Sequence, residues 1–345
     1  MTPKKICHIL AGNGTLGGLE KHVIDLSATQ AARGFEVSVL TTAALAPHFD
    51  ERVNVVPVRL DRSRLDPRLR SEIRQALRLL DPEVVHAHAN KSAATVGKLL
   101  SSLPCRSVAT VQNIKKNQTM FGDFDQVITA SQMVADTLDV PATVIYNSID
   151  RPNFDLKREA EALNPPFRDL GKPILYAAGR FVEAKGYDYL LEALAEVPEA
   201  HLWLVGDGPD KQMFNEMIAR LGLKERVWMP GFLPVSQVLG LMTRADLFVI
   251  SSRREGGPYT LAEALRYRCG VVSTRVGYAP EFLKDGQLCE SASSSGVAAG
   301  LKRALDDLDA YKSAMLPIFE HADIDLDIET MVDRVIAVYE KAMAS

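Results

Sequence analysis

Cysteines and long apolar runs are both scarce in this sequence. The four cysteines are Cys7, Cys105, Cys269 and Cys289. They lie far apart without paired spacing, which argues against a disulfide framework and against a zinc site built on cysteine pairs. The first apolar run, residues 6–11, is too short for the core of a signal peptide, and no later run is long enough to cross a bilayer. We therefore expect reduced cysteines in a cytoplasmic protein.

A strong net charge is also absent, since the formal charge is −4 at pH 7. Locally, however, seven arginines crowd into residues 59–78, between apolar residues at helical spacing. This pattern predicts an amphipathic helix whose basic face is either simply solvated or a surface for anionic lipid or an acidic acceptor. A lipid contact would place the protein on the cytoplasmic face of the inner membrane. No aromatics are interleaved and no nucleic-acid motif occurs, so we expect no nucleic-acid partner.

Length and composition indicate a two-domain globular protein. The 345 residues exceed what one core usually holds, and contents of 47% hydrophobic and 24% charged residues are ordinary for a globular chain. Apolar strands alternate with helical patterns in both halves, which predicts two α/β domains with parallel, doubly wound, Rossmann-like sheets. Prolines interrupt a polar segment between the halves. We expect a first domain at residues 1–150, a linker at 151–172 and a second domain at 173–327.

The expected strands follow from these patterns. They are residues 5–10, 36–41, 53–58, 84–88, 106–112, 126–130 and 143–146 in the first domain, and 173–178, 201–205, 227–229 and 247–251 in the second. Helices at 294–306 and 328–342 follow. Open sheets of this kind bind ligands at the carboxyl ends of their strands, so we expect a central cleft that both sheets face.

Residues 251–281 hold the densest group of candidate site residues. Glu255 and Glu263 stand eight positions apart, the first in a predicted turn and the second inside a predicted helix. Between them, Gly256, Gly257 and Pro258 let a ligand approach the amides at the start of that helix. Such amides and the helix dipole bind phosphate, and Glu263 could accept bonds from sugar hydroxyls. The alternative is a connector with two solvated glutamates.

Glycine-containing loops follow the first strand of each predicted domain. Residues 12–18, GNGTLGG, match the dinucleotide fingerprint G-x-G-x-x-G, which makes an NAD-dependent oxidoreductase an alternative. That fingerprint needs a carboxylate at the end of the second strand, where Thr41 and Thr42 stand instead. The second loop, residues 179–186, carries Arg180 and Lys185 at a spacing that can straddle a diphosphate. Solvated cations beside a helix are the alternative.

Two histidines end the predicted strand at residues 84–88. We expect His86 and His88 on opposite faces of that strand, an arrangement too close and too straight for two ligands of one metal ion. His88 either lines the cleft or is a core histidine with satisfied hydrogen bonds.

Together these motifs resemble those of retaining glycosyltransferase family 4, whose fold is GT-B. The resemblance rests on the spacing of the glutamates at 255 and 263, on the Gly-Arg and Lys-Gly pairs of residues 179–186, and on the Gly-Gly-Leu-Glu loop at 17–20. It implies that the last helix, residues 328–345, packs back on the first domain.

Three positions depart from the family pattern. Gly257 stands where an aromatic residue is usual, and Tyr278 replaces the second glycine of a paired-glycine turn. Gln112 stands where the family often has a histidine near the donor sugar. Because an amide can hydrogen-bond but cannot titrate, no protein base is expected at Gln112.

The resemblance implies a role for each matched position. Arg180 and Lys185 would bind the donor phosphates, and Glu255, near the donor sugar, completes the catalytic set. The donor-binding positions would be Gly17, Gly18, Gly206, Gly208, Met229, Phe232, Gly256, Gly257, Pro258, Tyr259, Thr260 and Glu263, the last on the ribose. The acceptor-side positions would be Glu20, His88 and Gln112. Neither a metal ion nor a cofactor is expected, because the nucleotide sugar is a substrate.

The implied reaction moves a sugar from a nucleotide-diphosphate donor, a UDP-sugar by the family's commonest pattern, to a hydroxyl of a glycan or glycolipid acceptor. The anomeric configuration is kept, and cell-surface glycan or lipopolysaccharide biosynthesis is the implied setting. Stabilising the departing phosphate is then the main catalytic task. The alternatives are the NAD-dependent oxidoreductase, a GT-B nucleotide-sugar epimerase and a catalytically idle carbohydrate-binding relative.

Overall fold

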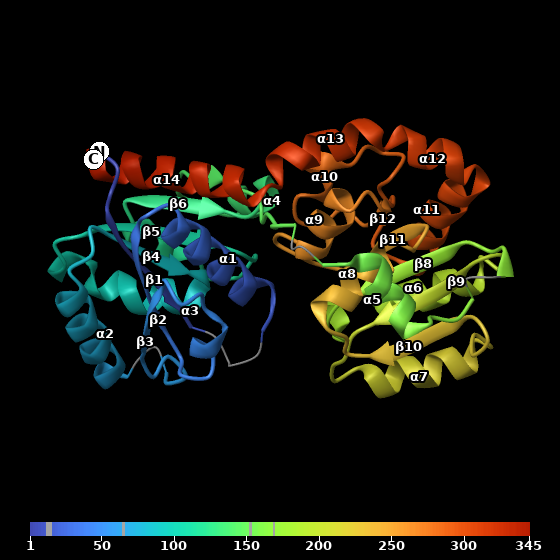
Figure 1. The fold of residues 1–345 in the computed structure, drawn as a ribbon, viewed down its shortest axis with the longest axis horizontal. Coiled ribbons are helices and arrows are strands. Elements are labelled where there is room, and N and C mark those ends of the chain that lie inside the picture. Colours follow the sequence, from blue (N-terminus) through green and yellow to red (C-terminus); the bar gives the residue numbers. More distant parts are fainter. Residues whose placement is uncertain (12–15, 64–65, 152–153, 168–169) are drawn as a thin grey trace. The chain divides into compact units, whose positions relative to one another are not determined.

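Two compact α/β units make up the chain. The computed structural model describes residues 1–11, 16–63, 66–151, 154–167 and 170–345. Unit 1 comprises Met1–Asp150 and Asp325–Ser345, and unit 2 comprises Arg151–Ile324. Each unit is built on one parallel sheet with helices packed around it (Figure 1), which confirms the expected pair of doubly wound sheets. Of the described helices, none is both long and apolar enough to cross a membrane.

Unit 1 is organised around a seven-stranded sheet in the order β3-β2-β1-β4-β5-β6-β7. Its strands are β1 Lys5–Leu10, β2 Glu36–Thr41, β3 Asn54–Pro57, β4 Val84–His88, β5 Arg106–Val111, β6 Gln126–Thr129 and β7 Thr143–Val144. All neighbouring pairs are parallel. Because β1 pairs with both β2 and β4, the winding of the chain reverses between β1 and β4, and ligands of open α/β sheets bind at such a reversal.

Helices pack on both faces of this sheet. They are α1 Gly18–Ala32, α2 Pro67–Leu80, α3 Ala89–Val96, α4 Gln132–Ala135 and α14 Ile328–Ala344, with 3-10 turns at Ala46–His48, Gly97–Ser102 and Thr119–Asp123. In α2 the buried residues Leu69, Ile73 and Leu77 recur every fourth position and pack on one face with α3, as a one-sided apolar stripe requires. Arg64 of the arginine-rich segment lies outside the described residues, and binding of that segment to lipid stays a prediction.

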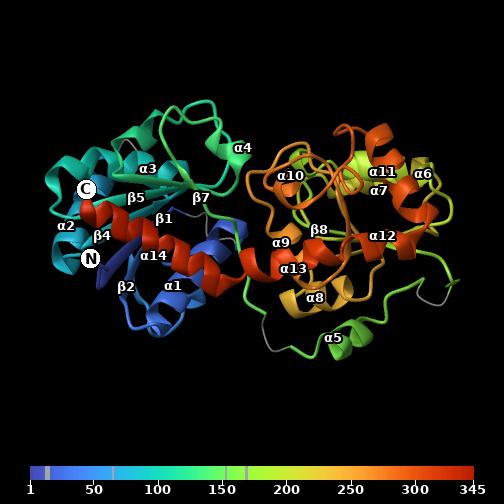
Figure 2. The ribbon, with the colours of Figure 1, turned by 90° about the horizontal axis from the view of Figure 1, so that it is seen from above.

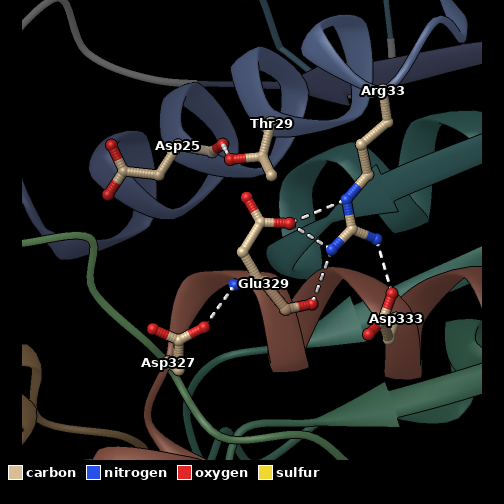
Figure 3. Close-up of polar contacts among 6 residues, drawn as sticks. All are labelled: Asp25, Thr29, Arg33, Asp327, Glu329 and Asp333. Carbon is tan, nitrogen blue, oxygen red and sulfur yellow. Dashed lines mark hydrogen bonds and ion pairs between the residues drawn. The ribbon is translucent and has the colours of Figure 1, made fainter.

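The C-terminal helix α14 packs on the opposite face of the unit 1 sheet. Val335 and Tyr339 of α14 share a buried cluster with Val84 of β4 and Val108 of β5, and the helix lies along the sheet in both views (Figures 1 and 2). Arg33, directly after α1, binds two carboxylates of α14 (Figure 3). Its Nε donates to Glu329 Oε2 at 2.8 Å, and its Nη1 donates to Asp333 Oδ1 at 2.5 Å.

Unit 2 repeats the plan with a five-stranded sheet in the order β10-β9-β8-β11-β12. Its strands are β8 Ile174–Ala178, β9 His201–Val205, β10 Val227–Gly231, β11 Leu247–Ile250 and β12 Gly270–Ser273. Its helices are α5 Leu156–Leu163, α6 Tyr187–Ala195, α7 Lys211–Arg220, α8 Val235–Met242, α9 Tyr259–Arg266, α10 Ala279–Phe282, α11 Ser294–Asp306, α12 Leu308–Ala314 and α13 Leu316–Asp325, with a 3-10 turn at Glu183–Lys185. The reversal lies between β8 and β11, because β8 pairs with β9 on one side and β11 on the other.

The segment expected as a linker, residues 151–172, carries a helix. The Asp155 side chain caps the start of α5 by accepting a bond from the Arg158 amide. Glu159 of α5 accepts a 2.9 Å bond from Ser236 Oγ of α8, so α5 is packed on unit 2. Pro165 and Pro166, two of the prolines that suggested a linker, directly follow Asn164, the left-handed C-cap of α5, and prolines are common just after a helix.

Candidate functional site

The loops after β8 and β11 come together at the reversal point of unit 2. Arg180 and Lys185 lie in the first loop, and residues 255–258 lie in the second. Both loops leave the carboxyl ends of neighbouring strands, because β8 and β11 pair in parallel register. The cationic motif and the glycine-rich turn are far apart in the sequence. The structure places them side by side, at the edge where open α/β sheets bind ligands.

Lys185 and Glu255 form a shielded ion pair at this edge. Lys185 Nζ lies 2.6 Å from Glu255 Oε1, and the two side chains are only 21% and 14% exposed. Ser252 Oγ donates to the same carboxylate oxygen at 2.8 Å. Charges in a partly buried pair are screened less than surface charges, so this pair is a strong local electrostatic feature.

A close backbone contact between the two loops requires the glycine after Lys185. Gly186 has φ +61°, and a Cβ on this residue would lie 2.1 Å from the carbonyl oxygen of Ser251. Ser251 Oγ also donates to the Lys185 carbonyl at 3.1 Å. A side chain at position 186 would therefore push the loops apart and separate Lys185 from Glu255.

Arg253 is a second link between the loops, and no motif in the sequence points to it. Its guanidinium forms two bonds to the Asp188 carboxylate, at 2.7 and 2.5 Å, and its backbone amide donates to the Ala184 carbonyl at 2.9 Å. The guanidinium also lies 3.8 Å from the centre of the Tyr189 ring. The hydrogen bonds to Asp188 raise the pKa of Arg253, while Arg253 keeps the pKa of the partly buried Asp188 below its usual value.

Arg180 differs from Lys185 in its surroundings. It is exposed, and it forms no ion pair with the residues that the structure describes. Its carbonyl accepts a bond from the Val182 amide, which keeps the loop tight at this point. A cation that is not paired within the protein can bind an anionic ligand without first losing a partner.

The glycines of the turn after β9 have a packing role. Gly206 has φ +144°, and a Cβ there would lie 1.9 Å from the Gly179 carbonyl oxygen. Gly208 has φ +159°, and a Cβ there would lie 2.4 Å from the Phe181 carbonyl oxygen. Both glycines thus let the β9 turn pack against the loop that carries Arg180. Their expected role in donor binding stays a prediction.

Further donor-binding candidates surround the start of α9. Pro258 is the N-cap residue of α9, with Tyr259 buried behind it and Thr260 partly buried. Glu263 is partly buried, one turn into the helix. Of the two candidates near β10, Met229 is partly buried and Phe232 is 80% exposed. An exposed phenylalanine side chain after a strand offers apolar surface that a ligand could cover.

The start of α1 in unit 1 contains the Gly-Gly-Leu-Glu loop. Gly17 is the N-cap residue, and its amide donates to Glu20 Oε2 at 3.1 Å, while Gly18 begins the helix. Glu20, expected on the acceptor side, therefore caps its own helix. Gly12 and Gly14 of the dinucleotide fingerprint lie outside the described residues. Thr41, at the end of β2, is buried and donates to the Leu10 carbonyl.

His88 lies inside a buried group of histidines on the α14 face of the sheet. His8 Nδ1 is hydrogen-bonded to His88 Nε2 at 2.9 Å, and His8 Nε2 to Gln30 Oε1 at 2.7 Å. His86 Nδ1 lies 2.7 Å from the Tyr339 hydroxyl of α14. Burial lowers the pKa of His8 to about 4 and holds the pKa values of His86 and His88 well below normal. His88 is 1% exposed, so its acceptor-side role stays a prediction.

The expectation that His86 and His88 lie on opposite faces is wrong. Their rings are 4.1 Å apart, because residues two apart on a strand point to the same face. Together with His8 they place three ligand nitrogens within 4.8 Å of one another, close enough for one metal ion. Hydrogen bonds within the protein already use both nitrogens of His8 and of His86, so an ion would have to displace them.

Gln112 is paired with another buried amide. Its Nε2 donates to Asn147 Oδ1 at 3.1 Å, and Asn147 Nδ2 donates back to Gln112 Oε1 at 3.0 Å. The reciprocal pair joins the segments that follow β5 and β7. A ligand that hydrogen-bonds Gln112 must therefore compete with Asn147.

Two family models match the chain, one for each half. The model described as Glycosyltransferase Family 4 matches residues 16–151, and the model described as Glycosyl transferases group 1 matches residues 159–314. Known glycosyltransferases are similar over 48% and 89% of this chain. The chain belongs to the family 4 type of GT-B glycosyltransferases.

Relatives of this glycosyltransferase-family chain include bacterial and human proteins. The lipopolysaccharide core biosynthesis glycosyltransferase LpsE of Rhizobium meliloti is 30% identical over 166 residues, which is 48% of this chain and 44% of that protein. The chain thus spans less than half the length of this relative. One subunit of the human phosphatidylinositol N-acetylglucosaminyltransferase is 24% identical over 89% of this chain and 68% of its own length.

Solved structures confirm the GT-B fold. The Anabaena protein HepE in complex with UDP superimposes with a TM-score of 0.80 at 21% identity, covering 97% of this chain and 99% of HepE. At this identity the likeness shows the fold alone. Within the family 4 chain, the positions expected for the donor lie mostly in unit 2, where Lys185 and Glu255 touch. Gly17, Gly18 and the three acceptor-side positions lie in unit 1.

Proposed function

We propose that this protein is a retaining glycosyltransferase that transfers a sugar from a nucleoside diphosphate, UDP in the first instance, to a hydroxyl of a glycan or glycolipid. The proposed setting is cell-surface glycan or lipopolysaccharide biosynthesis on the cytoplasmic side of the membrane. The observation that carries the proposal is the Lys185–Glu255 ion pair at the carboxyl ends of β8 and β11. Family membership and the UDP complex of the HepE structure support it.

The arrangement suits stabilisation of a leaving diphosphate. Arg180 and Lys185 supply positive charge, and α9, which begins after its N-cap Pro258, supplies the backbone amides of a helix N-terminus. As the bond from the anomeric carbon to the phosphate oxygen breaks, negative charge develops on the diphosphate, and preorganised cations and amides stabilise that charge. Glu255 holds Lys185 in place until the diphosphate binds.

The anomeric configuration is retained when the acceptor attacks from the side of the leaving group. The acceptor oxygen forms the new bond to the anomeric carbon, and its proton passes to the departing phosphate oxygen. No protein base is needed for this step. Gln112, whose side-chain amide cannot act as a base, is compatible with it. We also propose that the transfer needs no metal ion, so turnover should survive EDTA, and loss of turnover in EDTA would contradict this point.

Replacement of Lys185 tests the proposal. Lys185→Ala should lower the release of nucleoside diphosphate from the preferred UDP-, GDP- or ADP-sugar by ~100–1000-fold, the usual cost of one preorganised donor to developing charge. Lys312→Ala is the matched control, because Lys312 Nζ pairs with Asp246 Oδ1 at 2.7 Å just before β11, at the amino end of that strand. Initial rates with and without glycolipid acceptor give the measurement.

The two variants should separate cleanly. Lys312→Ala also loses one ion pair of unit 2 and should keep wild-type turnover within about threefold, since surface pairs contribute little to stability. Equal turnover in Lys185→Ala and Lys312→Ala would contradict the diphosphate assignment. In the product of the wild-type reaction, NMR coupling constants should show the anomeric configuration of the donor, and an inverted product would overturn the retaining mechanism.

A further inference from the structure

Tyr278 reaches from the turn after β12 to the start of α9. Its side chain is fully buried, and its hydroxyl donates to the carbonyl oxygen of Pro258 at 2.7 Å. The backbone of Ala262 is hydrogen-bonded to the same hydroxyl. Burial raises the pKa of Tyr278 well above its usual value, so the hydroxyl keeps its proton and remains a donor.

Gly277 braces the same segment through its backbone. Its amide donates to the Glu255 carbonyl at 3.1 Å, and its φ is +52°. A Cβ at position 277 would lie 2.5 Å from Pro258 Cδ, so only glycine allows this approach. One turn, Gly277-Tyr278, therefore contacts both ends of the 255–258 segment.

These contacts set the direction of the first turn of α9. The Pro258 carbonyl accepts from the Leu261 amide at 3.1 Å as well as from Tyr278, so the hydroxyl takes part in the first hydrogen bonds of the helix. If the hydroxyl is lost, the Pro258 carbonyl keeps the Leu261 amide but loses its buried bond from Tyr278, and the first turn of α9 is held less firmly. The backbone of residues 256–258 would then shift.

We propose that Tyr278 is a positioning residue that fixes the α9 start for the diphosphate of the donor. This proposal rests on the proposed function. It concerns a residue that differs from the glycine of the family pattern, and glycine has no hydroxyl with which to hold Pro258. Tyr278 acts through Pro258 and the backbone, and it does not touch the ligand.

The test compares Tyr278→Phe with Tyr311→Phe in the full chain. Tyr311 is the matched control, because its buried hydroxyl also donates to a backbone carbonyl at 2.7 Å, that of Val271 in β12. Both variants lose one such bond and should melt at similarly lowered temperatures. Calorimetry on the wild type first shows which of UDP, GDP and ADP it prefers. Calorimetry on the variants then measures the affinity for that diphosphate and for its nucleoside, for example UDP and uridine.

Tyr278→Phe should bind the diphosphate about tenfold more weakly than Tyr311→Phe does, and the nucleoside equally well. Equal affinity of both variants for the diphosphate would overturn the positioning role. A parallel loss for nucleoside and diphosphate would also overturn it, because that pattern indicates general damage. A wild type that binds none of the three diphosphates would instead contradict the proposed function itself.

A measurement on the wild type alone avoids dependence on the folding of a variant. The diphosphate, but not the nucleoside, should slow hydrogen exchange of the Gly277 amide, which is bonded to the Glu255 carbonyl. Unchanged exchange of this amide at saturating diphosphate would contradict the coupling between the Gly277-Tyr278 turn and the phosphate site.

Discussion

Lys185 and Glu255 hold opposite charges 2.6 Å apart with most of both side chains removed from solvent. A bound diphosphate would bring at least one more negative charge to this pair. Lys185 would then be shared between two anions, while Ser252 Oγ still holds the Glu255 carboxylate. The carboxylate is thus positioned independently of the lysine, which suits a residue expected beside the donor sugar.

Glu263→Gln should weaken nucleotide binding more than it changes folding. A carboxylate that accepts ribose hydroxyls contributes ~1.5–3 kcal/mol as a charge-assisted hydrogen bond, so affinity for the nucleoside diphosphate should fall ~10–150-fold. Glu216→Gln on α7 is the control, because Glu216 is exposed and accepts a local bond from Gln212 within the same helix. Calorimetry that gives the same affinity for both variants would assign Glu263 a structural role.

Single functional residues were predictable from the sequence where they belong to a motif. They were not predictable where their importance comes only from tertiary contacts. Arg180, Lys185 and the glutamates stand out because their spacing is unusual. Arg253 does not, since its importance comes from Asp188 and from the Ala184 carbonyl, residues far from it in sequence. The available signal was a pair of arginines, residues 253 and 254, before the glycine-rich turn, and such arginines are common on surfaces.

At the scale of elements, α14 is held to unit 1 by apolar packing and by polar contacts along its length, among them a bond from Thr2 to Glu340. Arg33 binds its first turns from the end of α1 (Figure 3), and Tyr339 is hydrogen-bonded to His86 of β4. The histidine contacts depend on neutral rings, because burial disfavours the charged form. This attachment is therefore sensitive to acid.

Acid should destabilise unit 1. The pKa values of His8 and His22 fall from 6.5 to about 4 on burial, so the unfolded state binds protons first as the pH drops. The stability is complete above about pH 6.5 and is lost as the pH falls toward 4. Between pH 7 and pH 5 each buried histidine should cost about 2 kcal/mol of unfolding free energy.

Urea unfolding at the two pH values measures this loss. His86→Gln should reduce the loss, while His48→Gln, at an exposed position of unit 1, should not. Both tryptophans, Trp203 and Trp228, lie in unit 2, so their fluorescence follows unit 2 and circular dichroism follows both units. A loss that tryptophan fluorescence reports in full, or that His86→Gln leaves unchanged, would contradict this account of the histidines.

The regular elements were predictable because their patterns are local. Most strands of the two sheets are rich in apolar residues, and α2 shows buried apolar residues at every fourth position directly in the sequence. The short helices α5, α10, α12 and α13 were missed. In α5 the signal is one cap and two turns of helix, and its stability comes from packing on α8, which no local pattern reports.

At the scale of the whole molecule, the two sheets share one winding plan. In each, the first strand of the unit lies beside the strand at which the winding reverses, β1 beside β4 and β8 beside β11. A dinucleotide would bind at the reversal in unit 1, and the diphosphate of a sugar donor at the reversal in unit 2. The identity of the ligand therefore reports which unit carries the principal site.

Ligand-induced stabilisation is the most direct test of the central claim, that unit 2 binds the nucleoside diphosphate of a sugar donor. UDP, GDP, ADP and NAD would each be added to the full chain, and melting would be followed by tryptophan fluorescence, which reports unit 2, and by circular dichroism, which reports both units. A ligand at ~100 times its dissociation constant adds about 2.7 kcal/mol of stability. The account predicts a raised melting temperature with at least one diphosphate and an unchanged melting temperature with NAD. A shift with NAD in circular dichroism but not in tryptophan fluorescence, with no shift for any diphosphate, would contradict it and assign the site to unit 1.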